Sequence, residues 1–327
     1  MRVLVTGIAG FVGAHLADFL RAQHPEVQVF GLVRPHGSLP ELPLRVFPVE
    51  ADLEDSAAVE AAFDVVHPDR IIHLAAQSSV HRSWEDPAGT LRANVLGLLN
   101  MLEAVRRRAL APRILVIGSA EEYGQVDPKE IPLDEKAPLR PNSPYAVSKV
   151  SQSYLALQYA LSHQMAIIRT RTFHHTGPGR GEIFAESSFA RQIAEIELKR
   201  RPPMIEVGNL EAVRDFSDVR DVVRAYWALL DRGEPGEVYN VCSGQSLRIR
   251  DLLDRLITLA EVDVEIRVDG SRLRPADIPA LVGNPRKLQQ VTGYAPRIDL
   301  AETLGDLLRY WRERLGAGRP SLPQAAR

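Results

Sequence analysis

A glycine-rich segment at residues 6–13, with the sequence TGIAGFVG, follows a short apolar run and opens a helix-like stretch. Gly7 would permit a tight turn, Gly10 would let the backbone approach a pyrophosphate, and Gly13 would let a helix pack closely on a strand. The N–H groups at the start of such a helix favour a phosphate. The segment predicts a dinucleotide-binding loop, to which we assign Gly7, Gly10, Phe11, Val12 and Gly13.

Apolar strand-like runs alternate with helix-period segments through the first half of the chain. The runs lie at 3–5, 27–33, 46–49, 71–75, 114–117 and 166–168, and helical stretches such as 58–65 and 90–107 lie between them. Strands joined through helices form right-handed units in a parallel sheet that is covered on both faces. The pattern therefore predicts an α/β fold with a Rossmann-type doubly wound parallel sheet.

Glycine and proline interrupt this pattern after about residue 176, and shorter elements follow. We expect part of this region to form a smaller C-terminal substrate-binding lobe over the carboxyl edge of the sheet, where open α/β sheets bind ligands. The predicted division is a dinucleotide-binding domain at 1–172, to which later segments return, a mainly substrate-binding lobe at 173–315 and a flexible tail at 316–327.

The composition excludes several other classes of protein. With 40 basic and 42 acidic residues the 327-residue chain has a net charge of −2, which lacks the basic field that a nucleic-acid partner requires. No uncharged apolar run reaches the ~18 residues that span a membrane. The single cysteine, Cys242, excludes a disulfide framework, and the nine histidines lack metal-ligand spacing. We expect a cytoplasmic protein that binds no nucleic acid, membrane or metal.

The end of the second predicted strand bears on the choice of cofactor. A carboxylate there would bind an unmodified ribose and select NAD, whereas Arg34 offers a guanidinium that suits the 2′-phosphate of NADP. We therefore expect NADP(H), with NAD(H) as the alternative if Arg34 is only an exposed loop residue. Asp52, after the third strand, can meet the adenine amino group. The remaining residues assigned to the cofactor are Leu53, Leu74, Ala75 and Ala76.

A proton-transfer site is predicted where a helix begins after Ser143, a good N-cap that precedes a proline. Tyr145 and Lys149 are then four residues apart and share one face of the helix. An unperturbed phenol has a pKa of ~10, and we expect the Lys149 ammonium and the helix N-terminus to lower the pKa of Tyr145 toward neutrality. Ser119, at the end of the fifth strand, can hydrogen-bond a substrate oxygen beside that phenol.

In the order and spacing of these motifs, residues 1–315 resemble an extended short-chain dehydrogenase/reductase of the NAD-dependent epimerase/dehydratase family, whose members modify nucleotide sugars. The segments at 209–216 (NLEAVRDF), 238–244 (VYNVCSG) and 274–277 (RPAD) resemble the GDP-mannose branch, first its GDP-4-keto-6-deoxy-mannose reductases and next its GDP-mannose 4,6-dehydratases. The resemblance implies an enzyme that acts on a GDP-linked hexose, with catalytic roles for the serine, the tyrosine and the lysine named above.

The resemblance also implies the substrate contacts. Arg214 and Arg274 would clamp the diphosphate through their guanidinium groups. Asp277 would accept a hydrogen bond from a ribose or base, and Ser78 would touch the hexose. His174 stands where family members commonly have an asparagine near the diphosphate; it can still donate to a phosphate, with a charge that depends on pH.

Glu121 distinguishes between activities within the family. By the resemblance, a dehydratase has a glutamate at this position that takes the C5 proton of the sugar, whereas a simple 4-epimerase usually has a small residue. The short connection at 34–44 and Phe216 are more typical of reductases. We predict NADP-dependent reduction of the C4 keto group of a GDP-4-keto-6-deoxy hexose, which leads to GDP-6-deoxy-mannose (GDP-rhamnose). The alternatives are a GDP-mannose 4,6-dehydratase, a nucleotide-sugar 4-epimerase and a non-enzymatic NADP-sensing protein.

Family members often pair helices in a four-helix dimer interface. The helices expected at 90–107 and 145–161 are the candidates here. The resemblance therefore implies a homodimer.

Overall fold

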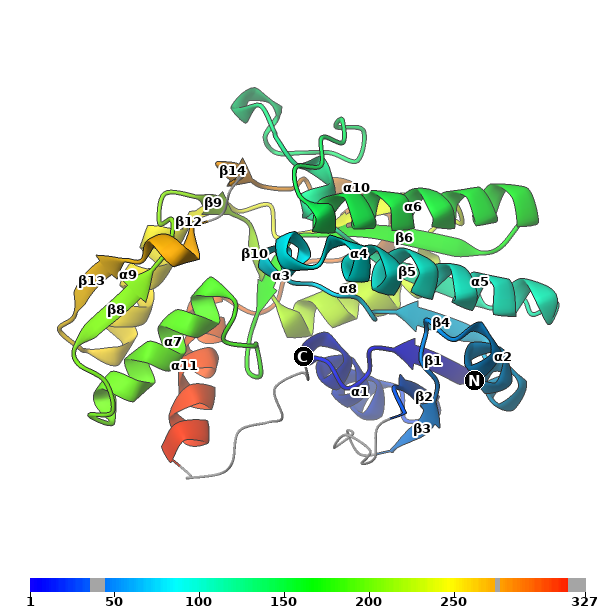
Figure 1. Ribbon diagram of the computed structural model, residues 1–327, viewed down its shortest axis with the longest axis horizontal. Helices are drawn as coiled ribbons and strands as arrows, with labels where there is room; N and C mark the ends of the chain where they lie inside the picture. The colour runs from blue at the N-terminus through cyan, green and yellow to red at the C-terminus, as the bar shows by residue number, and fades with distance from the viewer. Residues whose placement is uncertain (36–44, 274–276, 317–327) are drawn as a thin grey trace.

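Seven parallel strands form the central sheet of the computed structural model, which describes residues 1–35, 45–273 and 277–316 (Figure 1). The order across the sheet is β11-β6-β5-β4-β1-β2-β3. The strands are β1 (Arg2–Thr6), β2 (Gln28–Val33), β3 (Val46–Glu50), β4 (Arg70–His73), β5 (Arg113–Ser119), β6 (Ile167–Thr172) and β11 (Val238–Val241). The prediction of a doubly wound α/β sheet is confirmed.

Alternate residues of each strand face opposite layers of helices, because successive side chains of a strand point to opposite faces. Val3 and Val5 of β1 pack with one layer, and Leu4 between them packs with the other. The first layer consists of α1 (Phe11–Gln23), α8 (Val219–Arg232) and α10 (Arg286–Thr292), and the second of α2 (Ser56–Val66), α5 (Gly97–Arg107) and α6 (Pro144–His163). Burial on both faces explains why β1, β2 and β5 consist mainly of apolar residues.

Three elements that follow residue 173 return to this sheet: α8, β11 and α10. β11 pairs in parallel with β6, with Val241 opposite Thr172. Trp227 and Leu230 of α8 lie in the same buried cluster as Leu16 of α1. The main chain therefore enters the sheet region again after leaving it, and the division at residue 172 stays a prediction.

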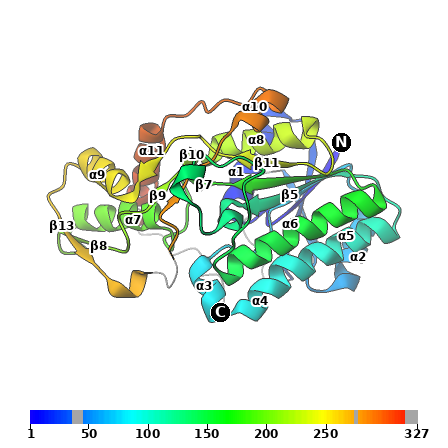
Figure 2. The same cartoon turned by 90° about the horizontal axis from the view of Figure 1, so that it is seen from above.

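The smaller lobe lies beyond one end of the sheet, as Figures 1 and 2 show. Its core contains side chains of α7 (Ala185–Glu197), α9 (Ile249–Ala260) and α11 (Leu300–Gly316). Short strands complete it: β7 (His174–Thr176) with β10 (Phe216–Asp218), β8 (Met204–Val207) with β13 (Glu265–Val268), and β9 (Val213–Arg214) with β12 (Leu247–Arg248) and β14 (Ala280–Leu281).

One helix of the second layer changes its type along its length. After the short α3 (Val80–Glu85), α4 (Pro87–Leu91) runs through a π-helical turn (Arg92–Leu96) into α5. Asn94 lies in this turn, and its side chain accepts the Gln77 N–H at 2.7 Å and donates to Ser148 Oγ of α6 at 2.8 Å. The helix expected at 90–107 is present, but its π-helical turn was not predicted.

Several predicted strand ends were wrong, and β5, for example, continues to Ser119 rather than ending at 117. β4 ends at His73 rather than at 75, and β6 continues to Thr172 rather than ending at 168. The added residues of β6 are polar but buried; Arg169, for example, donates to the Gly236 carbonyl at 2.8 Å. Of the predicted tail, 317–327 lie outside the described residues. Within the described parts of the chain, no helix is long and apolar enough to cross a membrane.

Candidate active site

A cavity of about 2190 Å³ lies where the carboxyl ends of the strands meet the C-terminal lobe. The register brings the strand ends level, with Thr6 of β1 opposite His73 of β4 and His73 opposite Val116 of β5. Residues of α7, β9 and α11 line the lobe side of the cavity. In an open α/β sheet this edge is the place where ligands bind.

The glycine loop after β1 forms one wall of the cavity. Gly7 has a φ of 71°, a left-handed conformation that favours glycine, and a Cβ on it would lie 2.8 Å from the Ala75 nitrogen. A Cβ on Gly13 would lie 2.5 Å from the Gly7 carbonyl oxygen, so α1 packs tightly on its own turn. Gly10 is the N-cap of α1 and is exposed at the cavity. The start of α1 can therefore offer its backbone N–H groups to a phosphate.

The other residues assigned to the cofactor line the same cavity: Phe11, Val12, Arg34, Asp52, Leu53, Leu74, Ala75 and Ala76. The Thr6 hydroxyl joins the two loops, because it accepts the Ala75 N–H at 3.1 Å and lies 2.9 Å from Nδ1 of the buried His73. The exposed guanidinium of Arg34 lies just beyond β2. The narrow contact between the loops, the open helix end and this cation fit a bound NADP or NAD.

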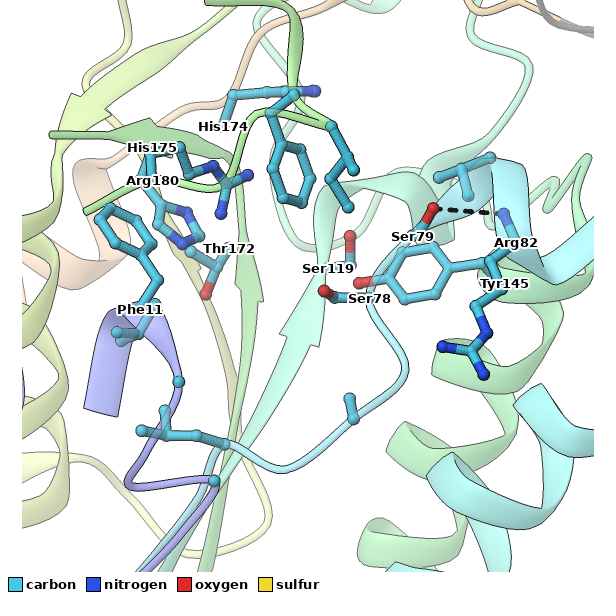
Figure 3. A pocket seen from close by; sticks show the side chains of 18 of the residues that line it. Phe11, Ser78, Ser79, Arg82, Ser119, Tyr145, Thr172, His174, His175 and Arg180 are labelled. Carbon is cyan, nitrogen blue, oxygen red and sulfur yellow. Dashed lines mark hydrogen bonds between the residues drawn. The ribbon is translucent and has the colours of Figure 1, made fainter. Parts of the chain in front are cut away.

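The predicted proton-transfer residues meet in this cavity. Ser143 caps α6 by accepting the Ala146 N–H at 3.1 Å, which places Tyr145 in the first turn of the helix. Figure 3 shows the hydroxyls of Ser119 and Ser78 beside the phenol of Tyr145. The Ser119 and Tyr145 hydroxyls are close neighbours at the wall of the cavity (Figure 3). The site therefore brings together two hydroxyl groups from β5 and α6 that can face one substrate oxygen.

The expected lowering of the Tyr145 pKa was wrong. Burial raises the pKa of Tyr145 well above its usual value, and the neighbouring Ser119 hydroxyl offsets only part of that shift. The Lys149 Nζ donates to the Ile117 carbonyl at 2.8 Å and to Gln152 Oε1 at 2.9 Å instead of to the phenol. The phenol is therefore protonated at neutral pH, as a proton donor must be.

Lys149 is itself buried, and this burial lowers its pKa to about 8. The nearby Glu122 carboxylate opposes the shift. An ammonium group has three donors, and the contacts with Ile117 and Gln152 fix the direction of two of them. A contact with β5 and a contact within α6 thus hold the Lys149 side chain in one orientation.

Two glutamates follow Ser119 and differ in their surroundings. Glu121 lines the cavity, is 7% exposed, and donates its backbone N–H to Ser119 Oγ at 3.2 Å. The Glu122 side chain is fully buried and accepts the Ser119 N–H at 2.9 Å. Burial raises the pKa of Glu122 to about 7, although the neighbouring Arg171 lowers it. Glu121 was predicted to be near the chemistry, and Glu122 was not.

The residues predicted for the substrate belong to the same cavity, with one exception. Ser78, His174, Arg214 and Asp277 all line it, and Arg274 lies outside the described residues. The Arg214 guanidinium donates to the Ile278 carbonyl at 2.7 Å and to Asp277 Oδ1 at 3.0 Å. Asp277 also accepts from the Asn209 amide at 2.6 Å. Their roles toward a diphosphate and a ribose stay predictions.

Sequence reasoning missed a cationic wall opposite the phenol. Arg180 lies with its guanidinium 3.4 Å from the ring centroid of Phe184 and 5.2 Å from that of Phe11, and its Nε donates to Glu186 at 3.4 Å. The His175 ring stacks on Phe11 at 6.2 Å (Figure 3). The available signal was a cation in a glycine-rich loop (GPGRG) directly after β7. In the described parts of the chain, no cluster of three or more His, Cys, Asp or Glu could hold a metal ion.

Known proteins resemble this chain over most of its length. The family model for GDP-mannose 4,6 dehydratase matches residues 4–307. A GDP-6-deoxy-D-mannose reductase from Pseudomonas aeruginosa is 38% identical over 96% of this chain and 98% of its own length. A GDP-mannose 4,6-dehydratase from Yersinia enterocolitica is 29% identical over 94% of this chain and 92% of its own length.

Solved structures also resemble this one over almost the whole chain. The structure of RMD from Pseudomonas aeruginosa complexed with NADPH has a TM-score of 0.85 and 37% identity, and the match covers 96% of this chain and 99% of that one. A UDP-glucose 4-epimerase from Thermus thermophilus complexed with NAD has a TM-score of 0.84 and 30% identity over 95% of this chain and 99% of that one. The likeness covers both the sheet and the lobe.

Proposed function

The chain belongs to the GDP-mannose 4,6-dehydratase family, and we propose that it is an NADPH-dependent reductase of the C4 keto group of a GDP-4-keto-6-deoxy hexose. The observation that supports this most is the placement of the Ser119 and Tyr145 hydroxyls together in the cavity that contains the glycine loop. The relative named as a GDP-6-deoxy-D-mannose reductase adds to it, because the likeness covers nearly the whole of both chains.

The residues of the first wall suit NADP(H), with NAD(H) as the alternative. The open N-terminus of α1 would bind the pyrophosphate, and the exposed Arg34 would pair with the 2′-phosphate. Lys149 would donate to the nicotinamide ribose. When bound, NADPH supplies the hydride that reduces the carbonyl carbon. The solved relative that contains NADPH supports the preference.

The chain's own residues provide the proton. Ser119 orients the C4 carbonyl by donating a hydrogen bond to its oxygen, and Tyr145 gives its phenolic proton to the same oxygen as the carbonyl carbon is reduced. One hydride and one proton thereby convert the ketone to a secondary alcohol, and the phenolate regains its proton from solvent. Because the pKa of Tyr145 is raised, the phenol stays protonated at neutral pH until the substrate oxygen accepts its proton.

The lobe would hold the rest of the substrate. Arg214, together with Arg274, would bind the diphosphate, and His174 can donate to a phosphate in the same cavity. Asp277 would accept from the ribose or base, and Ser78 would touch the hexose. The GDP moiety is supported by the names of the relatives in the family.

GDP-mannose 4,6-dehydratase activity is the second candidate function. Glu121 favours it, because a carboxylate in the cavity beside the phenol could take the C5 proton before water leaves C6. The dehydratase relatives also match nearly the whole chain, although at lower identity. A 4-epimerase is less well supported, since the matching family model and the curated relatives named above are GDP-mannose dehydratases and a GDP-sugar reductase.

Product analysis separates these candidates. The purified protein is incubated with GDP-mannose, alone and after treatment with a GDP-mannose 4,6-dehydratase, and with NADPH or NADH. The reductase consumes one NADPH for each molecule of the 4-keto-6-deoxy sugar and leaves GDP-mannose unchanged. Conversion of GDP-mannose to a keto sugar without net use of cofactor would establish the dehydratase instead.

We also propose a homodimer, formed by the α4–α5 helix and α6 of each subunit. Large apolar side chains are exposed along α6 at a seven-residue spacing: Val147 (43%), Tyr154 (56%) and Leu161 (71%). Leu91 and Leu96 are exposed on the neighbouring helix (Figure 2). A seven-residue apolar repeat is typical of helices that pack on other helices.

The cytoplasm stays our proposed location, as the reduced cofactor and the buried, unpaired thiol of Cys242 suit that compartment.

A further inference from the structure

Glu122, the second of the two glutamates after Ser119, is buried behind the residues that line the cavity. Glu122 is absent from the cavity lining, whereas Glu121, Ser119 and Tyr145 belong to it. Its side chain is fully buried at the end of β5, in the short 3₁₀ helix Ala120–Tyr123. Reduction of a ketone uses no group at this place, so the buried carboxylate needs another explanation.

Glu122 holds the main chain of Ser119 through a capping box. Its Oε1 accepts the Ser119 N–H at 2.9 Å, while Ser119 Oγ accepts the Glu121 N–H at 3.2 Å. The second contact occupies a lone pair of the Ser119 oxygen. The single hydroxyl proton of Ser119 then stays available for a hydrogen bond on the cavity side.

A buried network fixes Glu122 in turn. Its Oε2 accepts from Arg171 Nε of β6 at 3.2 Å, and both side chains are almost fully buried. The Arg171 guanidinium also donates to the Tyr123 hydroxyl at 3.2 Å and to the Glu135 carbonyl at 3.0 Å. Tyr123 donates to Asn240 Oδ1 of β11 at 2.7 Å. The position of Ser119 is thereby tied to β6 and β11, which form the far edge of the sheet.

A buried ion pair of this kind seldom adds to stability, because desolvation of both charges offsets their attraction. Satisfied buried networks instead fix one geometry, and misplacement of a reacting group by 1 Å can lower a rate ~10²-fold. From these contacts, and resting on the proposed function, we propose that Glu122 is a positioning residue for the reduction: it holds Ser119 so that its hydroxyl lies beside the Tyr145 phenol.

The chain contains a matched control for this proposal. Glu130 forms the same motif in the 3₁₀ helix Pro128–Glu130, where its carboxylate accepts the Asp127 N–H at 3.1 Å. It pairs with Arg140 at 2.7 Å, as Glu122 pairs with Arg171. Glu130 is not part of the cavity lining. Substitution of Glu130 therefore removes a capping box and an ion pair without touching the site.

The kinetic test compares Glu122→Ala, Glu122→Gln and Glu130→Ala in NADPH-dependent reduction of the keto sugar. Glu122→Ala should lower kcat ~10²-fold, with the KM of the sugar and the Kd of NADPH changed less than about threefold. Glu122→Gln should recover part of that loss, because its amide oxygen can still accept the Ser119 N–H. Glu130→Ala should leave kcat unchanged. A rise in KM with a normal kcat, or an equal loss in Glu130→Ala, would overturn the proposal.

A double-mutant cycle tests whether Glu122 acts through Ser119. In a Ser119→Ala background, Glu122→Gln should cost less than about twofold more, because residues that act as one unit are not additive. The full additional loss in that background would show that Glu122 stabilises the fold in general and would contradict the proposal. The same cycle serves if Glu122→Ala fails to fold, since it uses only the conservative variant.

A measurement without substrate separates this inference from the proposed function. In [15N]serine-labelled protein, the amide proton of Ser119 should move upfield in Glu122→Ala and keep its shift in Glu130→Ala, because only the first variant removes the carboxylate acceptor. An unchanged Ser119 resonance in Glu122→Ala would refute the positioning contact. If the wild-type protein does not reduce the keto sugar, the proposed function fails, and this measurement still tests the contact.

Discussion

Tyr145 and Lys149 are one helical turn apart, and burial drives both toward their neutral forms. The pKa of the phenol rises, and the pKa of the ammonium falls to about 8. An isolated helix would show only the attraction between the cation and a phenolate, which is why the sequence suggested a lowered phenol pKa. The fold adds desolvation, which is the larger effect for groups this deep.

Removal of the phenolic oxygen should therefore stop proton donation and little else. We expect Tyr145→Phe to lower kcat by ~10²–10⁴-fold, the usual contribution of a general acid, while the Kd of NADPH changes only a few-fold. Stopped-flow turnover and cofactor fluorescence titration measure the two quantities. Turnover close to that of the wild type would contradict the mechanism and favour a protein that binds NADP without catalysis.

Arg34 should decide between the two cofactors. Arg34→Asp places a carboxylate where the 2′-phosphate of NADP would lie, so repulsion should weaken NADPH binding and leave NADH binding equal or stronger. Kd values for both cofactors measure this change. Arg21→Asp is the control, since Arg21 is exposed on α1 but does not line the cavity. An unchanged preference in Arg34→Asp would remove the basis for the NADP assignment.

At the scale of the elements, the strands that consist mainly of apolar residues could be predicted from the sequence. They are apolar because helices cover both faces of the sheet. β1 and β5 each contain an apolar run, and the glycine loop has a local signature that its surroundings do not alter. The last residues of β6 could not be predicted, because Arg169 and Arg171 are buried by partners far away in the chain. The same reason hid Glu122 and Arg180 from sequence reasoning: their contacts join segments that only the folded chain brings together.

The exposed stripe on α6 leads to a prediction about assembly. Glutamate at both Tyr154 and Leu161 would place charges in the apolar centre of the proposed four-helix interface, where burial of an unpaired charge is costly. We expect this double variant to sediment as a monomer at concentrations where the wild type is a dimer. Leu259→Glu, on α9 and 44% exposed in the wild type, should leave the sedimentation unchanged. A wild-type monomer would contradict the proposed interface.

At the scale of the whole molecule, the buried His73 and the half-buried His175 make stability depend on acidity. Burial lowers the pKa of His73 to about 3 and of His175 to about 4, from 6.5. Both are neutral in the folded protein but take up a proton on unfolding below pH 6.5, so stability is complete above that value and falls with decreasing pH. Each should cost about 2 kcal/mol of the free energy of unfolding at about pH 5.

Denaturant titrations at several pH values measure this loss. His73→Asn should show a shallower decline between about pH 7.5 and pH 5 than the wild type, by about 2 kcal/mol. His81→Asn, at an exposed position on α3, should decline as the wild type does. Parallel curves for the wild type and His73→Asn would contradict the assignment of a neutral buried ring.

The return of α8 and β11 to the sheet has a consequence for a chain that is still being made. β1 and α1 leave the ribosome early, but the apolar face of α1 has to wait for α8, and the edge of β6 for β11, until most of the chain has been synthesised. Until then the nascent protein exposes an apolar helix face and an unpaired strand, the surfaces through which partly folded chains aggregate. Chaperones that shield such surfaces during translation should therefore matter more for this protein than for one whose layers close in the order of their synthesis.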